Sequence, residues 1–271
     1  MSFRPKLIAL DIDGTLLIPL PDTGHSAEDV TPAVRAAVDR AVDSGCHIVL
    51  ASGRAPLSMS WVLGRLDLPR EDGQALAVAS NGAVTFSFPP MEVLSEVTFD
   101  AREAVRTVME HVPEAAVAVE EHGVGYRVNR HFPAGELDGE MILTPVEDLI
   151  ASEVSRVIIR DPDSTSEDFV TLAKKLGLHG TNYFIGWTAW IDLAPEGVSK
   201  ASGLAEVASR LGVDASEVLA IGDGRNDIEM LEWAGRGVAM GQAPTEVKAI
   251  ADAVTDAVEQ DGAALEINRW F

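Results

Sequence analysis

The sequence has little cysteine, little aromatic content and no long apolar run. Cys46 is the only cysteine among 271 residues, so no internal disulfide can form, which favours a reducing compartment. The longest apolar runs, such as Leu7 to Leu10 and Ile48 to Ala51, fall far short of the roughly 18 residues that a membrane span needs. The apolar stretch near the N-terminus breaks at Asp11, which is not a signal-peptide pattern. We expect a cytoplasmic protein.

Basic residues are also scarce. Lys and Arg number 21 against 43 Asp and Glu, which gives a formal net charge of −22. Nucleic acids and anionic membranes need a cationic face, so neither is expected as a partner. A phosphorylated small molecule could be held only where a metal ion and a few basic side chains reverse the local field.

Apolar runs alternate with helical patterns at both ends of the chain, which indicates a parallel sheet. The expected strands are Leu7 to Leu10, Ile48 to Ala51, Leu76 to Ala79, Val218 to Ile221, Gly237 to Met240 and Ala253 to Thr255. The clearest expected helices are Pro32 to Ser44 and Ser199 to Leu211. Several strands end in polar, turn-forming clusters, and ligands bind beyond the carboxyl ends of strands in such sheets.

The middle of the chain, roughly Gly82 to Trp190, has a different pattern. Alternating segments at Val93 to Phe99, Ala115 to Val119, Val124 to Val128 and Val157 to Ile159 accompany helical patterns at Asp100 to His111 and Ser166 to Leu176. Strands mixed with two helices predict a small α+β domain inserted into the first domain.

The strongest chemical signal is the cluster Asp11-Ile12-Asp13-Gly14-Thr15, directly after an apolar strand. Carboxylates suit magnesium, and a carboxylate can attack phosphorus. An isolated Asp-Gly pair is more often an ordinary turn. A second acidic pair, Asp223 and Asp227, follows another apolar strand, so the two groups could converge into a metal site. Ser52, the Gly53 amide and Lys200 could bind phosphate oxygens.

These residues lie in four motifs: Asp11-Ile12-Asp13-Gly14-Thr15-Leu16, Ser52-Gly53-Arg54, Lys200, and Gly222-Asp223-Gly224-Arg225-Asn226-Asp227. In this order they resemble the motifs of the haloacid dehalogenase-like (HAD) phosphatases. Ser80-Asn81-Gly82-Ala83 and Val238-Ala239-Met240-Gly241 are similar to the Cof-type subfamily, which carries an inserted α+β cap of the C2B type. The resemblance implies a Rossmann-like α/β core of residues 1–81 and 191–271 and a cap domain of residues 82–190.

The resemblance also implies a role for each motif residue. Asp11 would be the nucleophile, and Asp13 the general acid and base. Mg²⁺ would be bound by Asp11, the Asp13 backbone carbonyl and Asp223. The remaining roles are phosphate binding by Ser52, Gly53, Lys200 and Asn226, support of Lys200 or a metal-bound water by Asp227, and substrate contact by Arg54, for which pairing with an acid is the alternative.

These roles imply a magnesium-dependent phosphatase that hydrolyses a small phosphorylated metabolite, with sugar phosphates first, through an aspartyl-phosphate intermediate. A phosphomutase and a catalytically silent phospho-ligand-binding regulator stay open as alternatives. Two features depart from the family pattern: a long segment from Ile18 to Val30, and Gln242 where asparagine is common. Neither lies within the four motifs, and the sequence predicts neither the oligomeric state nor the physiological substrate.

Overall fold

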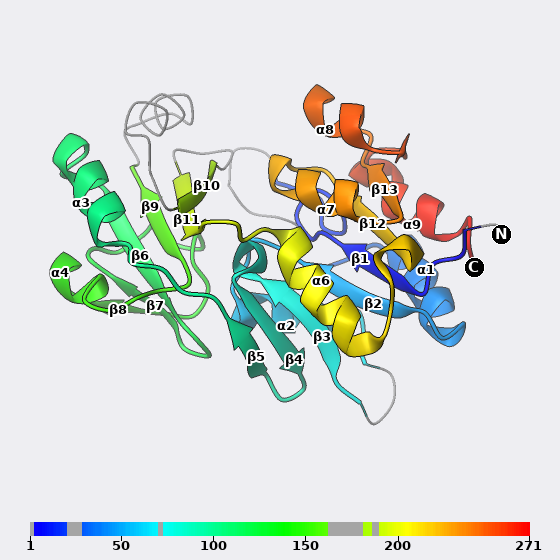
Figure 1. Ribbon diagram of the computed structural model, residues 1–271, viewed down its shortest axis with the longest axis horizontal. Coiled ribbons are helices and arrows are strands. Elements are labelled where there is room, and N and C mark those ends of the chain that lie inside the picture. The colour runs from blue at the N-terminus through cyan, green and yellow to red at the C-terminus, as the bar shows by residue number, and fades with distance from the viewer. Residues whose placement is uncertain (1–2, 21–28, 70–72, 162–180, 186–189) are drawn as a thin grey trace. The chain divides into compact units, whose positions relative to one another are not determined.

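The protein is described from a computed structural model, which is drawn in Figure 1. The structure describes residues 3–20, 29–69, 73–161, 181–185 and 190–271. The chain divides into two compact units, Met1–Leu94 with Ser199–Phe271, and Ser95–Val198. Within the described residues, every helix is too short or too polar to cross a membrane.

The first unit is built on an eight-stranded sheet in the order β14-β13-β12-β1-β2-β3-β4-β5. Neighbouring strands from β14 to β3 are parallel, and β4 runs antiparallel to β3. The strand bounds are β1 (Leu7–Leu10), β2 (His47–Ala51), β3 (Ala75–Ala79), β4 (Val84–Phe88), β5 (Glu92–Glu96), β12 (Val218–Gly222), β13 (Arg236–Ala239) and β14 (Ala253–Val254). The chain order reverses direction at β1, so loops from both ends of the chain meet beyond β1 and β12.

Helices cover both faces of this sheet. Leu204 and Val207 of α6 and Met230 of α7 join strand residues such as Ala9 and Ala220 in one apolar core. Figure 1 shows α1 and α2 on the opposite face. The helix bounds are α1 (Pro32–Asp43), α2 (Pro56–Arg65), α6 (Lys200–Leu211), α7 (Ile228–Trp233), α8 (Thr245–Ile250) and α9 (Gly262–Ile267), with short 3₁₀ turns η1 (Ser80–Gly82), η2 (Ala215–Glu217), η3 (Arg225–Asp227) and η4 (Val258–Gln260).

The start of α6 is fixed by a local sequence signal. The Ser199 side chain accepts a hydrogen bond from the Ser202 amide, and the Ser202 hydroxyl accepts one from the Ser199 amide. This reciprocal cap satisfies amides that the first turn of a helix leaves without partners. At the other end Gly212 has φ +67°, a conformation that favours glycine and stops the helix. Lys200 is therefore held at the first position of a well-defined helix.

The second unit contains a six-stranded sheet in the order β10-β11-β9-β6-β7-β8. Its strands pair antiparallel except for β7 and β8. The bounds are β6 (Ala116–Glu121), β7 (Gly125–Val128), β8 (Glu140–Leu143), β9 (Val157–Arg160), β10 (Thr181–Ile185), β11 (Trp190–Pro195), α3 (Arg102–His111) and α4 (Val146–Leu149). Val105 and Val108 of α3 pack on Val117 and Ile159 of the sheet. The helix expected at Ser166 to Leu176 lies outside the described residues.

The predicted fold class, a parallel-sheet α/β core with an α+β insertion, is confirmed. The structure divides the chain at different residues, however, after Leu94 and after Val198. Residues 84–88 form β4, which folds back on β3 with Ala79 opposite Val84, and β5 extends the same sheet. An alternating pattern indicates a strand but not which sheet the strand joins. The segment from Val93 to Phe99 therefore begins in the first unit rather than in the insertion.

Candidate active site

Asp11 lies immediately after β1, where the chain turns sharply. The Asp11 amide donates to the Ile221 carbonyl at 3.0 Å, which continues the pairing of β1 with β12 past the strand end. The turn closes when the Gly14 amide bonds the Leu17 carbonyl at 2.9 Å. Gly14 has φ +86°, which favours glycine. The Asp11 side chain is consequently fixed at the carboxyl edge of the sheet, and Asp11 is 5% exposed.

Lys200 is the cation of this site. Its side chain is completely buried, and Nζ lies 2.6 Å from Oδ1 of Asp11 and 2.6 Å from Oδ1 of Asp227. The other oxygen of Asp227 accepts hydrogen bonds from the Asp223 amide at 2.9 Å and the Gly224 amide at 2.8 Å. Both oxygens of Asp227 are thus engaged by the protein. Asp227 holds Lys200 in place, and Lys200 in turn holds Asp11.

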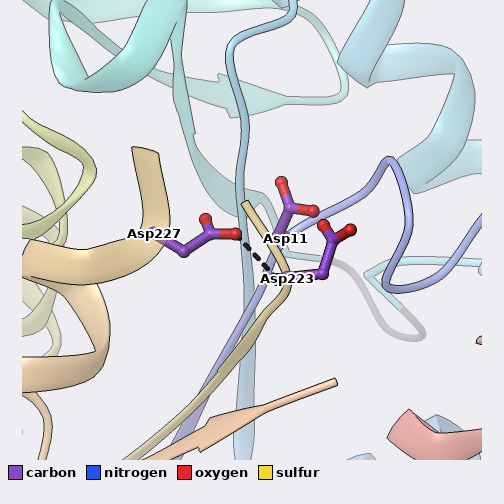
Figure 2. A group of neighbouring side chains, drawn as sticks. All are labelled: Asp11, Asp223 and Asp227. Carbon is purple, nitrogen blue, oxygen red and sulfur yellow. Dashed lines mark hydrogen bonds between the residues drawn. The ribbon is translucent and has the colours of Figure 1, made fainter. Parts of the chain in front are cut away.

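Asp11, Asp223 and Asp227 form the carboxylate cluster drawn in Figure 2. One oxygen from each carboxylate lies within 4.8 Å of the others, and all three residues are buried. Figure 2 also shows the hydrogen bond by which the Asp227 side chain caps the Asp223 backbone. Three carboxylates face one lysine, so the cluster has an excess of negative charge that a cation could neutralise.

This excess charge appears in the pKa values. Burial, followed by the charge of Asp227, raises the pKa of Asp11 well above its usual range, although Lys200 opposes the rise. Burial and the charge of Asp227 also raise the pKa of Asp223 to about 7. Burial alone would lower the pKa of Lys200, but the carboxylates of Asp11 and Asp227 outweigh it and raise the pKa. Lys200 is therefore charged, and the cluster favours either a proton or a metal cation.

The loop after β2 carries Ser52, Gly53 and Arg54. Ser52 is 2% exposed, and its hydroxyl accepts a hydrogen bond from the Arg54 amide at 3.2 Å. The Arg54 side chain reaches Asp13, with Nε 2.8 Å from Oδ2 and Nη2 2.6 Å from Oδ1. Of the two expectations for Arg54, the structure contains the pairing with an acid. Asp13 stands outside the carboxylate cluster, and its side chain is 42% exposed.

Sequence reasoning gave no role to two side chains at this site. Gln242 donates from Nε2 to the Gly14 carbonyl at 2.5 Å and to Oδ2 of Asp223 at 3.3 Å, and its Oε1 accepts from the Val258 amide at 3.1 Å. Asn81 accepts a hydrogen bond from Nδ2 of Asn226 at 3.0 Å. Asn81 stood in a segment that is similar to the subfamily, and Gln242 was noted only as a departure from the family pattern. Their contacts depend on distant parts of the chain, so a local motif does not reveal them.

Comparison with known proteins identifies the family. A family model described as haloacid dehalogenase-like hydrolase matches residues 8–267. The chain belongs to this family. It is a Cof-type HAD phosphatase, an enzyme that hydrolyses phosphoric monoesters, as the four motifs and the two subfamily segments predicted. The family match spans the motifs at both ends of the chain and the insertion between them.

Individual relatives support the same assignment for this HAD phosphatase. Phosphoglycolate phosphatase of Natronomonas pharaonis is 31% identical and aligns with 94% of this chain and 93% of its own. The 5-amino-6-(5-phospho-D-ribitylamino)uracil phosphatase YcsE of Bacillus subtilis is 29% identical over 98% of this chain and 95% of its own. A solved HAD phosphatase from Bacteroides thetaiotaomicron has a TM-score of 0.76 and 32% identity, covering 98% and 95% of the two chains.

Proposed function

We propose that this HAD phosphatase hydrolyses a small phosphorylated metabolite in a magnesium-dependent reaction in which Asp11 is the nucleophile. The observation that carries the proposal is the contact between Lys200 and Asp11. Nζ of Lys200 holds Oδ1 of Asp11 at 2.6 Å and thereby fixes the orientation of a buried carboxylate. A nucleophile held in one orientation loses less entropy on the way to the transition state. The second oxygen of Asp11 is the one that would attack phosphorus.

Asp13 is proposed as the general acid and base. It lies two residues beyond Asp11 in the same turn, and its side chain is accessible to a substrate. Two hydrogen bonds from Arg54 fix the direction of the Asp13 carboxylate. In the first step Asp13 would give a proton to the oxygen of the leaving alcohol while Asp11 bonds to phosphorus. In the second step it would take a proton from the water that cleaves the aspartyl phosphate.

The transferring phosphoryl group would be held by Ser52, the Gly53 amide, Lys200 and Asn226. Phosphoryl transfer places charge on three equatorial oxygens, so positioned donors and one buried cation supply the stabilisation it needs. Lys200 is the only one of these residues with a formal charge, and it is completely buried. A charge in a dry environment interacts more strongly with phosphate than a charge in water.

The carboxylate cluster fits a divalent metal ion. Both oxygens of Asp227 are used by protein donors. The cation would therefore be held by an oxygen of Asp223 and by Oδ1 of Asp11, the oxygen that Lys200 also contacts, which leaves the second oxygen of Asp11 for phosphorus. Oxygen ligands of this kind suit Mg²⁺, which would neutralise charge on the phosphate and the carboxylates. The raised pKa values of Asp11 and Asp223 support the proposal, because they indicate that the site has too little positive charge for its carboxylates.

A small substrate agrees with the charge of the chain and with its relatives. The net charge of −22 disfavours polyanions, so the phosphate of the substrate must be recognised locally. The named relatives are a phosphoglycolate phosphatase and a phosphatase that acts on a phosphoribityl compound. We therefore place sugar and sugar-alcohol phosphates first among the expected substrates, followed by short phosphorylated acids.

Phosphate release from a panel of sugar phosphates, phosphorylated acids and nucleotides tests this proposal. Release should require Mg²⁺, cease after chelation and return when Mg²⁺ is restored. Asp11→Asn should fold with an unchanged far-UV circular dichroism spectrum and release no phosphate, whereas Asp39→Asn on α1 should keep wild-type turnover. Full turnover by Asp11→Asn would contradict the nucleophile assignment.

The phosphomutase alternative predicts a different product. An aspartyl phosphate can pass its phosphoryl group to a sugar hydroxyl instead of water, and this chemistry needs the same residues. Incubation with a sugar monophosphate and a catalytic amount of the bisphosphate separates the two reactions. If the incubation yields isomerised sugar phosphate and no inorganic phosphate, the enzyme is a phosphomutase and the proposed hydrolysis is wrong.

A further inference from the structure

The turn η1 (Ser80–Gly82) connects segments that are far apart in sequence. The Ser80 amide donates to the Arg54 carbonyl at 2.9 Å, and the Asn81 amide donates to the Ser52 carbonyl at 3.0 Å. Gly82 packs so closely on the backbone before Lys200 that a Cβ atom on Gly82 would lie 2.0 Å from the Ser199 carbonyl oxygen. The turn therefore contacts the loop after β2 and the start of α6, two of the segments proposed to bind phosphate.

The backbone of η1 is strained. Ser80 has φ +50° and Asn81 has φ +55°, although neither residue is glycine. Each residue in this left-handed region costs free energy that other contacts must offset, and such strain tends to persist where neighbouring contacts determine the geometry. Both residues are almost completely buried, at 1% and 2% exposed. The backbone conformation of Ser80 and Asn81 is therefore held by contacts with neighbouring segments and not by the intrinsic φ preference of the two residues.

The Asn81 side chain extends the connection to the loop after β12. Its Oδ1 accepts a hydrogen bond from Nδ2 of Asn226 at 3.0 Å. The same amide group packs against Gly53, where an added Cβ atom would lie 3.1 Å from both its nitrogen and its oxygen. One buried side chain thus touches both Gly53 and Asn226, which come from opposite ends of the chain.

We propose that Asn81 is a positioning residue that orients Asn226 for the phosphoryl group. This inference rests on the proposed function. An amide nitrogen has two hydrogens, and the bond to Asn81 uses one of them. Because Oδ1 of Asn81 is an acceptor, the Asn226 amide turns its nitrogen rather than its oxygen toward Asn81. The second hydrogen on that nitrogen is then left for a phosphoryl oxygen. Asn81 acts through Asn226 and needs no contact with the substrate.

A double-mutant cycle tests this coupling. Asn81→Ala and Asn226→Ala should each reduce kcat/KM and the affinity for inorganic phosphate, measured by calorimetry with Mg²⁺ present, by about tenfold, the value of one lost hydrogen bond to an anion. The double variant should lose no more than Asn226→Ala alone, because Asn81 acts through the residue already removed. Independent losses that multiply to about a hundredfold would overturn the proposal.

A second variant separates positioning from folding. Asn81→Gly removes the amide but suits the positive φ, so its melting temperature should stay within a few degrees of wild type while phosphate affinity still falls about tenfold. Wild-type phosphate affinity in Asn81→Gly would overturn the proposal. Asn129→Ala is the matched control, since the Asn129 amide bonds only backbone groups of Val117 and Ala115 among the described residues. Any reduction of kcat/KM caused by Asn129→Ala should multiply with the reduction caused by Asn226→Ala, because the two residues are not coupled.

Failure of the inference and failure of the proposed function give different results. A wild-type protein that releases phosphate with Mg²⁺, combined with independent losses in the cycle, would overturn only the role of Asn81. A wild-type protein that neither releases nor binds phosphate would overturn the proposed function and this inference together.

Discussion

Gly14 lies directly against the carboxylate of Asp223. A Cβ atom on Gly14 would be 2.3 Å from Oδ2 of Asp223, far inside van der Waals contact. The two residues come from the loops after β1 and β12, so this close approach sets the distance between the acidic motifs. The absence of a side chain at position 14 is therefore needed both for the turn and for the position of Asp223.

Gly14→Ala should cost several kcal/mol of unfolding free energy and weaken Mg²⁺ binding, because the new methyl group displaces Asp223. Gly45→Ala is the matched control: Gly45 has φ +85°, nearly the same as Gly14, but nothing lies within 4 Å of its Cβ position. Its cost should be only the conformational penalty of about 1 kcal/mol. Urea unfolding and Mg²⁺ titration measure both effects. Equal losses in the two variants would show that backbone conformation alone matters at Gly14.

Lys200→Met should destabilise the protein by about 3–5 kcal/mol, because it leaves buried carboxylates without their counter-charge. The loss should be smaller at pH 5 than at pH 8, since protonated carboxylates need no cation. Urea unfolding at both pH values measures it. Lys6→Met is the control, because Lys6 forms a solvent-accessible ion pair with Glu217, and pairs of this kind contribute little to stability. A cost for Lys200→Met as small as that of Lys6→Met would contradict the buried network.

Removal of metal should make stability depend on the protonation of Asp223. Its pKa is raised from 3.8 to about 7, first by burial and then by Asp227. The folded state therefore binds more protons than the unfolded state between these values, and stability without metal should fall as pH rises through this window. Asp223→Asn should reduce this slope in chelator-treated protein. Added Mg²⁺ should restore stability above pH 7 in wild type but less in Asp223→Asn, and an unchanged slope in the variant would contradict the assignment.

His122 should stabilise the second unit up to alkaline pH. Its ring nitrogens lie 2.9 Å from Glu120 and 2.8 Å from Glu96, and the hydrogen bond to Glu120 is the main cause that raises the pKa of His122 to about 9. The charged form stabilises the fold fully below the unfolded pKa of 6.5, and this stabilisation is lost as pH rises through 9. His122→Gln should remove the fall in stability between pH 7 and 10.

The control for His122 is His111→Gln, since His111 bonds a backbone carbonyl of its own helix, that of Thr107. Proton NMR of the imidazole signals in wild type gives the titration midpoint directly. A midpoint near 6.5 for His122 would contradict the role of the two glutamates.

The sequence was informative wherever function depends on a short stretch of chain. The apolar runs that became β1, β2 and β12 end at the polar clusters that hold Asp11, Ser52 and Asp223, and this alternation of buried strand and turn is visible in the residue order. The contact of Arg54 with Asp13 stayed one of two alternatives, because a long flexible side chain can reach several partners.

Other features depend on the three-dimensional arrangement. The role of Asn81 requires a left-handed backbone and neighbours from both ends of the chain, which no local pattern encodes. The second unit begins later than the sequence predicted because β4 pairs with β3, and an alternating pattern does not indicate which strand will be the partner. Of the segment from Ile18 to Val30, residues 21–28 lie outside the described part of the chain, so the effect of its length stays a prediction.

The place of β1 in the sheet has a consequence for synthesis on the ribosome. On one side β1 pairs with β2, which follows soon after it, but on the other side it pairs with β12, near the end of the chain. This buried strand therefore leaves the ribosome long before its second partner exists, with one edge unpaired. Exposed strand edges promote aggregation, so a nascent chain of this architecture should bind chaperones until residues 218–222 have emerged.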